Sequence, residues 1–117
     1  GEGVGEVTRV RYSLGTILRN ERPEVEALVR DVAWRIRDVV GADVRNLWFG
    51  SWIRGDAGER SDVDLAVAAG RELSAIEVDE IRTRIESLPT LRRVDVVNLE
   101  IVGKGFREKI LGEGVPV

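Results

Sequence analysis

The chain has 117 residues and a formal net charge of −3 at pH 7, and it contains neither cysteine nor histidine. This length supports one domain with one hydrophobic core, and the missing residue types exclude disulfides, thiolate nucleophiles, zinc–thiolate sites and histidine bases. The slightly acidic charge argues against strong direct binding of nucleic acid through neutralisation of its phosphates. Because no apolar run approaches the length of a membrane span and no signal-peptide pattern is present, we expect a cytoplasmic protein without membrane contact.

Residues 1–22 form an N-terminal segment that we leave unassigned. Val10, Tyr12 and Leu14 alternate as in a strand. Three glycines within the first five residues are instead typical of an irregular start. The sequence therefore predicts no definite element in this segment.

A helix is predicted from Pro23 to the residue before Gly41. Proline is favoured at the first helical position, and glycine is favoured just after the last one. Apolar residues at helical spacing form one face of this helix: Val25, Leu28, Val29, Val32, Ile36, Val39 and Val40. That face is expected to lie against the core.

Three strands are predicted after this helix, over residues 44–50, 61–69 and 91–99. Their apolar, β-branched and aromatic residues favour extended structure. In the second strand the two faces would carry Val63, Leu65 and Val67 on one side and Asp62, Asp64 and Ala66 on the other. In the third strand one face would carry Asp95, Val97 and Leu99.

Two further helices are predicted from their end signals. Ser74 and Glu77 have the spacing of a capping box, which opens a helix that Pro89 ends. A short helix is expected over residues 106–111 and closed by Gly112. The predicted order is helix, strand, strand, helix, strand, helix.

Asp62 and Asp64 are the first candidates for chemistry. Two residues apart on a strand, they project from the same face with their backbones about 7 Å apart. Two like charges that close resist ionisation unless a cation lies between them. Carboxylate oxygens suit Mg²⁺, which takes its remaining ligands from water and substrate phosphates. The alternative is a solvated strand edge that carries two acids.

A Gly-Ser pair precedes these acids and is a candidate phosphate-binding element. Gly50 lets a ligand approach the backbone closely, and Ser51 is a good helix N-cap, where a helix start would direct free N–H groups at an anion. Arg54, within the next turn, can add a charge-assisted contact to phosphate. Ser61, directly before Asp62, is a further candidate for phosphate binding. Taken alone, the Gly-Ser pair is typical of an ordinary turn.

Asp95 is the third candidate acid. It is the only carboxylate in the string RRVDVVNL. If its strand lies beside the strand of Asp62 and Asp64, all three carboxylates face one cleft, where Asp95 can hold a second metal ion or take the proton from an attacking hydroxyl. The alternative is an edge-strand acid that pairs with Arg92 or Arg93.

The string FGSWIRGDAGERSDVDLAV (49–67) resembles the motif of the nucleotidyltransferases related to DNA polymerase beta, and in particular the minimal nucleotidyltransferases (MNT). The resemblance rests on Gly50-Ser51, ten intervening residues and Asp62-Val63-Asp64, and the strings VDVVNL and FREKILGEGVPV fit the same pattern. It covers roughly residues 23–117, which we take as the domain. Trp52 departs from the family, which more often has a polar or basic residue there.

This resemblance implies an α+β fold, with a small mixed sheet that has helices packed on one face and the active site on the other. It implies that Asp62 and Asp64 ligate Mg²⁺, with two ions expected, that Asp95 is the third carboxylate, and that Gly50 and Ser51 hold the outer phosphates. The implied reaction transfers a nucleoside monophosphate, usually AMP from ATP, to an acceptor hydroxyl and releases pyrophosphate. Such chemistry requires positioning and charge neutralisation rather than histidine or cysteine.

The acceptor is a separate question. Many minimal members resemble the antitoxin of toxin–antitoxin pairs whose partner is a small helical HEPN protein, and in some pairs AMP is attached to that partner. We therefore expect a protein adenylyltransferase that acts as an antitoxin. Two alternatives stay open: a non-enzymatic module that neutralises a partner by binding, and a small-molecule nucleotidyltransferase of the aminoglycoside type.

Trp34 is a candidate interface residue. It lies about 180° from the apolar face of the first predicted helix, among charged residues. A large aromatic side chain on a charged face is typical of a binding surface. We expect Trp34 to contact another copy of this chain or the helical partner; the alternative is that the N-terminal segment folds back over it.

Overall fold

A computed structural model of the chain describes residues 22–58 and 61–117. The N-terminal segment lies outside the described residues except for Arg22. The first helix covers residues 22–40 and ends directly before Gly41, as predicted. The later helices and strands follow in the order β1 (Arg45–Phe49), α2 (Ser51–Arg54), β2 (Val63–Ala68), α3 (Ala75–Glu86), β3 (Val94–Asn98), α4 (Lys104–Glu113) and β4 (Val115–Pro116).

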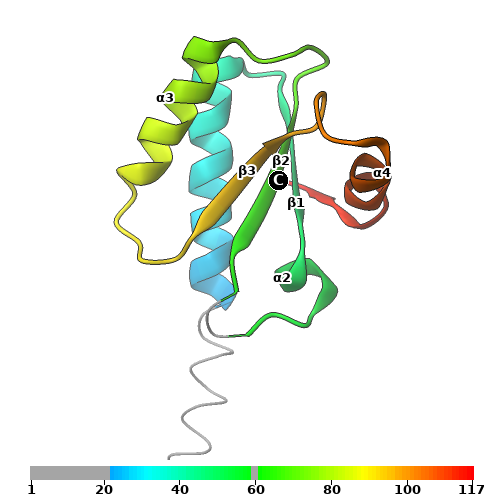
Figure 1. The fold of residues 1–117 in the computed structure, drawn as a ribbon. Helices are drawn as coiled ribbons and strands as arrows, with labels where there is room; N and C mark the ends of the chain where they lie inside the picture. The colour runs from blue at the N-terminus through cyan, green and yellow to red at the C-terminus, as the bar shows by residue number, and fades with distance from the viewer. Residues whose placement is uncertain (1–21, 59–60) are drawn as a thin grey trace, which may run out of the picture.

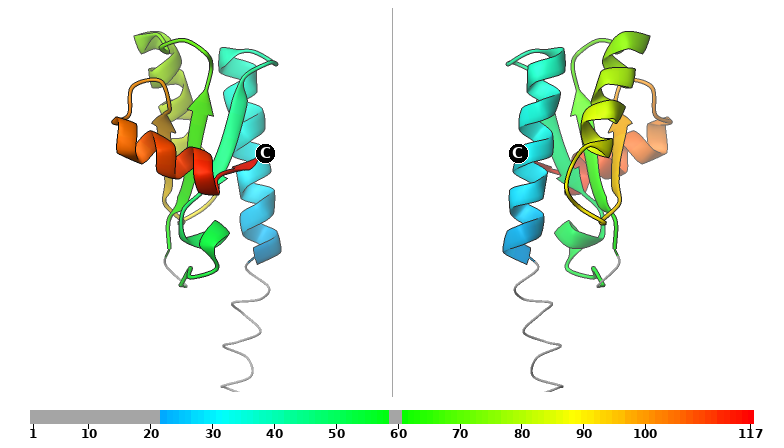
Figure 2. Two further views of the ribbon diagram at one scale, coloured as in Figure 1. Left: turned by 90° about the vertical axis from the view of Figure 1, so that its right-hand side faces the viewer. Right: turned by 90° about the vertical axis from the view of Figure 1, so that its left-hand side faces the viewer.

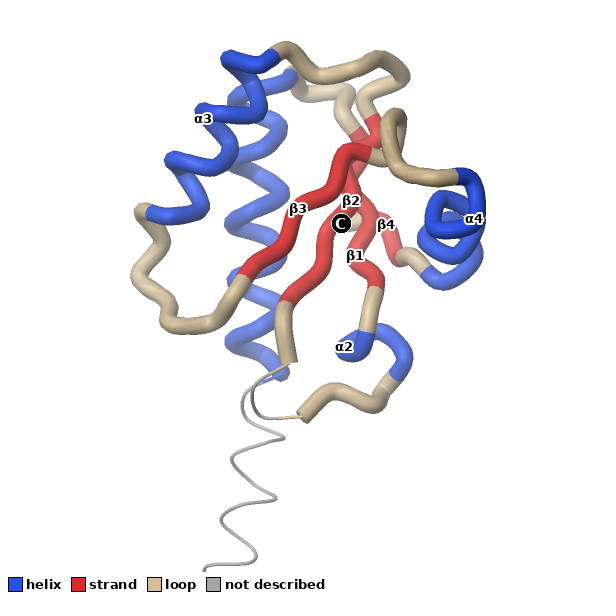
Figure 3. The backbone as a smooth tube through the Cα atoms, in the orientation of Figure 1, coloured by secondary structure: helices blue, strands red, loops and turns tan. Residues whose placement is uncertain are grey.

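The strands form one mixed sheet in the order β3-β2-β1-β4 (Figures 1 and 3). β1 runs antiparallel to β2 and to β4, whereas β2 and β3 are parallel. Parallel strands need a long crossover, and α3 supplies it. The strand β4 was not predicted, because two residues are too few to show any periodicity.

The 22–40 helix and α3 pack against one face of the sheet (Figures 1 and 2). The predicted apolar face of the 22–40 helix is confirmed, with Val25, Val29, Val32 and Ile36 all buried. These side chains join a cluster that includes Val63, Leu65 and Val67 of β2 and Ile81 of α3. The alternation of β2 therefore supplies one wall of the main core.

The opposite face of the sheet carries the smaller helix α4. Ile110 of α4 is fully buried against Leu47, Phe49 and Ala66. The resemblance implied helices on one face and the active site on the other. The structure refines this arrangement, because α4 shares the second face with Asp64.

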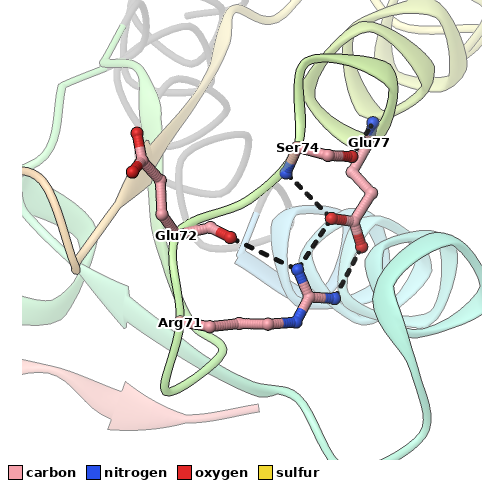
Figure 4. Close-up of polar contacts among 4 residues, drawn as sticks. All are labelled: Arg71, Glu72, Ser74 and Glu77. Atoms are coloured by element: carbon pink, nitrogen blue, oxygen red, sulfur yellow. Dashed lines mark hydrogen bonds and ion pairs between the residues drawn. The ribbon is translucent and has the colours of Figure 1, made fainter.

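The predicted start and end of α3 are confirmed, whereas the predicted end of α4 is wrong. Ser74 and Glu77 form the predicted capping box, and Arg71 adds two contacts of 2.8 Å to the Glu77 carboxylate (Figure 4). α3 ends at Glu86, before Pro89. The prediction that Gly112 closes the last helix is wrong. α4 continues to Glu113, and Gly114 caps it at a place where a Cβ atom would lie 2.6 Å from the Ile110 carbonyl oxygen.

Within the described residues, no helix combines the length and the apolar character that a membrane crossing needs.

Candidate active site

The sheet brings Asp64 and Asp95 next to each other. Asp64 lies opposite Asp95 in the parallel β2–β3 register and opposite Phe49 in the antiparallel β1–β2 register. Neighbouring strands are about 4.8 Å apart, so the two carboxylates lie side by side on one face. Asp62 precedes β2 by one residue, and it is half-buried like Asp64 and Asp95. The structure therefore places Asp64 beside Asp95, with Asp62 one residue before β2. The shared metal site expected of the three acids stays a prediction.

Gly50 lies directly against the Asp64 carboxylate. A Cβ atom on Gly50 would lie 2.3 Å from Oδ2 of Asp64, and the Gly50 backbone has φ 91°. Both features require glycine. Gly50, not Ser51, is the N-cap of α2, and a glycine has no side chain that could cap the helix. The expectation that Ser51 caps a helix is wrong by one position, because the chain turns at Gly50 and Ser51 is already helical.

The surroundings of Asp64 disfavour its charged form. Burial raises the pKa of the Asp64 carboxyl, the negative charges of Asp95 and Asp62 raise it further, and Arg54 opposes them. Hard carboxylate oxygens that repel one another suit a divalent cation, which would relieve the repulsion. By their chemistry, though not yet by their convergence, these carboxylates suit Mg²⁺. In the part of the chain that the structure describes, no three acidic side chains converge as a complete metal-binding group.

Arg93 occupies the space between two of the acids. Its Nε lies 3.1 Å from Oδ1 of Asp95 and 3.9 Å from Oδ2 of Asp62. The alternative interpretation of Asp95, a pair with a neighbouring arginine, is thus observed alongside the register that places Asp95 beside Asp64. The Arg93 side chain is largely exposed, so these contacts are weak enough for a metal ion to replace them.

Arg54 is held by two acids beside the site. Its Nε lies 3.4 Å from Oδ2 of Asp56, and its Nη1 lies 3.3 Å from Oε2 of Glu113. Sequence reasoning missed Glu113, since a lone acid near the end of a helix carries no signal of its own. The phosphate contact expected of Arg54 stays a prediction.

Ser61 closes the loop that leads into β2. Its hydroxyl accepts a 2.7 Å hydrogen bond from the Gly58 N–H group, and its carbonyl accepts one of 3.3 Å from Nε1 of Trp52. The Trp52 ring is buried, and the Arg92 guanidinium lies 5.2 Å from its centre. Trp52 thus ties α2 to the start of β2, which gives the unusual residue a structural role. Phosphate binding by Ser61 stays a prediction.

Solved structures resemble this fold. A protein assigned as a minimal nucleotidyltransferase is 31% identical, with a TM-score of 0.56, and the match covers 86% of this chain and 95% of that one. A toxin–antitoxin structure with AMP-PNP is 22% identical, with a TM-score of 0.58 and 74% and 69% of the two chains covered. The toxin–antitoxin MntA–HpeT, with two aspartates replaced by glutamate, is 17% identical, with a TM-score of 0.56 and 79% and 70% covered.

No curated protein matches the chain. The family described as Polymerase beta, Nucleotidyltransferase matches residues 44–117, which is more than half of the chain and includes Gly50, Asp64 and Asp95. The chain therefore belongs to the polymerase beta nucleotidyltransferase family.

Proposed function

We propose that this nucleotidyltransferase transfers AMP from ATP to a hydroxyl group of a partner protein, as the antitoxin of a toxin–antitoxin pair. The observation that carries the proposal is the placement of Asp64 beside Asp95 in register, with the backbone of Gly50 against the Asp64 carboxylate. Carboxylates can bind Mg²⁺ together with the phosphates of a substrate. A glycine beside them lets those phosphates approach the backbone closely.

In this proposal Asp62, Asp64 and Asp95 hold Mg²⁺, with two ions expected. When bound, the metal neutralises phosphate charge and stabilises the attacking and leaving oxygens. Gly50 and Ser51 bind the outer phosphates through their backbone. Arg54 and Ser61 are the further candidates for phosphate contacts.

The proposed reaction is an in-line displacement at the α-phosphorus of ATP. The oxygen of the acceptor hydroxyl forms a bond to that phosphorus, the bond to the bridging oxygen breaks, and pyrophosphate leaves. Asp95 accepts the proton of the hydroxyl. The protein contributes positioning and electrostatics, which is what phosphoryl transfer needs.

A partner protein is supported by two of the solved neighbours, which are toxin–antitoxin structures. In one of them two aspartates that are two residues apart are replaced by glutamate, the same spacing as Asp62 and Asp64. Trp34 supplies a surface for such contact, since its side chain is 62% exposed on the outer face of the 22–40 helix. We propose that Trp34 contacts a small helical HEPN-type partner or a second copy of this chain.

The test is to incubate the protein with Mg²⁺, ATP labelled at the α-phosphate, and the proposed HEPN-type partner. Label should appear on the partner, and ATP labelled at the γ-phosphate should transfer none. The Asp62→Asn, Asp64→Asn double variant is the control. A tight complex without label would instead mean a binding module, and label on a small molecule alone would mean a small-molecule nucleotidyltransferase.

A further inference from the structure

Glu113 is an acid beside the site that comes from an element with none of the predicted site residues. It is the last residue of α4, and its side chain is only 17% exposed. One carboxylate oxygen, Oε2, lies 3.3 Å from Nη1 of Arg54. The other, Oε1, is buried and has no hydrogen-bond partner within the described residues. Burying a carboxylate in this way costs free energy, so its placement calls for an explanation.

The backbone of Glu113 is firmly held. The Gly114 N–H group donates a 2.7 Å hydrogen bond to the Ile110 carbonyl, and Ile110 is itself fully buried. Directly after Gly114, Val115 pairs with Trp48 of β1. Glu113 is therefore fixed to β1, the strand that leads into Gly50.

Arg54 has much less support. It ends α2, which is a single turn, and Gly55 follows with φ 84°. The Arg54 side chain is 42% exposed, and its other acidic partner, Asp56, is 63% exposed. Since Glu113 is fixed and Arg54 is not, Glu113 holds the arginine rather than the reverse. Figure 2 shows the C-terminal end of α4 near α2, in agreement with this contact.

The pair also acts on the acids of the site. The positive charge of Arg54 lowers the pKa of the Asp64 carboxyl, and the negative charge of Glu113 raises it. Both side chains are thus within electrostatic reach of Asp64. Asp56 and Glu113 engage Nε and Nη1 of Arg54, while Nη2 has no hydrogen-bond partner in the described part of the chain.

A free arginine side chain loses rotamer entropy when it binds a ligand. A fixed carboxylate that already holds one nitrogen of the guanidinium reduces that loss and leaves another nitrogen for a phosphate oxygen. We propose that Glu113 is a positioning residue that directs Arg54 at the phosphates of the nucleoside triphosphate. This rests on the proposed function, and it concerns the phosphates rather than the base.

The test is a double-mutant cycle with Glu113→Gln, Arg54→Ala and the combined variant. Calorimetry should show that Glu113→Gln weakens binding of Mg-ATP by roughly threefold to tenfold. Inorganic tripolyphosphate should lose affinity by the same factor, because it has the phosphates without the nucleoside. In the Arg54→Ala background, Glu113→Gln should have no further effect. Glu108→Gln, an exposed change on the same helix, is the matched control and should bind like wild type.

Three outcomes would overturn the proposal. In the first, Glu113→Gln binds Mg-ATP as tightly as wild type or more tightly. Glu113 would then act only as a second negative charge near Asp64. In the second, its effect persists without Arg54, so that Glu113 supports α4 alone. In the third, ATP is weakened but tripolyphosphate is not.

The melting temperature of each variant without ligand shows whether a loss of binding arises from a loss of folding. If Glu113→Gln unfolds early, Arg54→Lys replaces it, because lysine keeps the charge but lacks the rigid planar fork that one carboxylate can orient. Equal binding by Arg54→Lys and wild type would then refute the proposal. If wild type itself binds no Mg-ATP, the proposed function fails. If wild type binds it and Glu113→Gln binds it equally, only the role of Glu113 fails.

Discussion

Glu77 and Asp64 are both half-buried carboxylates, but their surroundings act on them in opposite directions. At the start of α3, a hydrogen bond from Arg71 and one from the Ser74 backbone lower the pKa of Glu77 to about 2 (Figure 4). In the site, burial and the charges of Asp95 and Asp62 raise the pKa of Asp64. An acid that stabilises the fold is surrounded by donors, whereas an acid placed for a cation is surrounded by other acids.

The largest expected effect comes from removing the charges of the site. Asp62→Asn with Asp64→Asn should lower nucleotidyl transfer by at least about a thousandfold, or roughly 4 kcal/mol of activation free energy. It should also abolish the rise in melting temperature caused by Mg-ATP. Without ligand the variant should be at least as stable as wild type, because repulsion is removed. A double variant that still gains stability from Mg-ATP would refute the metal assignment.

Asp95→Asn tests whether the third acid belongs to chemistry or to binding. Because Asp95 is the proposed proton acceptor, transfer should fall by about a hundredfold, while affinity for Mg-ATP should change much less. Single-turnover kinetics and calorimetry measure the two quantities. Equal and large losses would identify Asp95 chiefly as a metal ligand, and unchanged transfer would remove it from the site. Glu80→Gln on the exposed side of α3 is the control.

The dependence of the free energy of unfolding on acid pH distinguishes Glu77 from Asp64, with a smaller effect than the loss of transfer. The folded pKa of Glu77 is lowered, so its contribution is present above its ordinary pKa of 4.5 and is lost as pH falls toward about 2. The folded pKa of Asp64 is raised, so the folded state binds that proton more tightly. Stability should therefore fall as pH rises from 3.8, the ordinary pKa, through the folded pKa of Asp64.

Urea unfolding of Glu77→Gln and Asp64→Asn over the acid range measures both effects. Glu77→Gln should be less stable than wild type at neutral pH, and the difference should vanish in strong acid. Asp64→Asn should match or exceed wild type at neutral pH and approach it in acid. The same direction of change in both variants would mean that the two carboxylates do not differ as described.

The sequence predicted those features that nearby residues determine. Ser74 and Glu77 form the expected capping box because both partners lie within one helical turn. The alternation around Asp64 correctly separated the face of β2 that joins the main core from the face that carries Asp64. Asp95 was chosen on the condition that its strand lies beside the strand of Asp64, and the parallel register of β2 and β3 confirms that condition.

Features that depend on distant residues were not predictable. Arg54 and Glu113 are 59 positions apart and meet only because α4 returns to β1. α4 ends before Gly114 rather than at the predicted Gly112. The packing of Gly114 against Leu47, not helix propensity, determines where the helix ends. Ser51 is not the N-cap that was expected, because the contact of Gly50 with Asp64 fixes where the chain turns.

Among the described residues, Trp34 takes part in neither a stabilising contact nor the acidic site, and its replacement should affect the folded monomer least. Its predicted exposure is confirmed at 62%, while the alternative cover, the N-terminal segment, lies outside the described residues.

Trp34→Ala should change the free energy of unfolding of the monomer by less than about 0.5 kcal/mol. If Trp34 anchors an interface, the same change should weaken self-association or partner binding by at least about thirtyfold, since buried tryptophans at hot spots contribute 2 kcal/mol or more. Light scattering measures self-association, and co-purification with the proposed HEPN-type partner measures partner binding. Ile76→Ala changes another exposed apolar residue, on α3 (75%), and is the matched control. An equal loss of assembly in both variants would contradict a specific interface at Trp34.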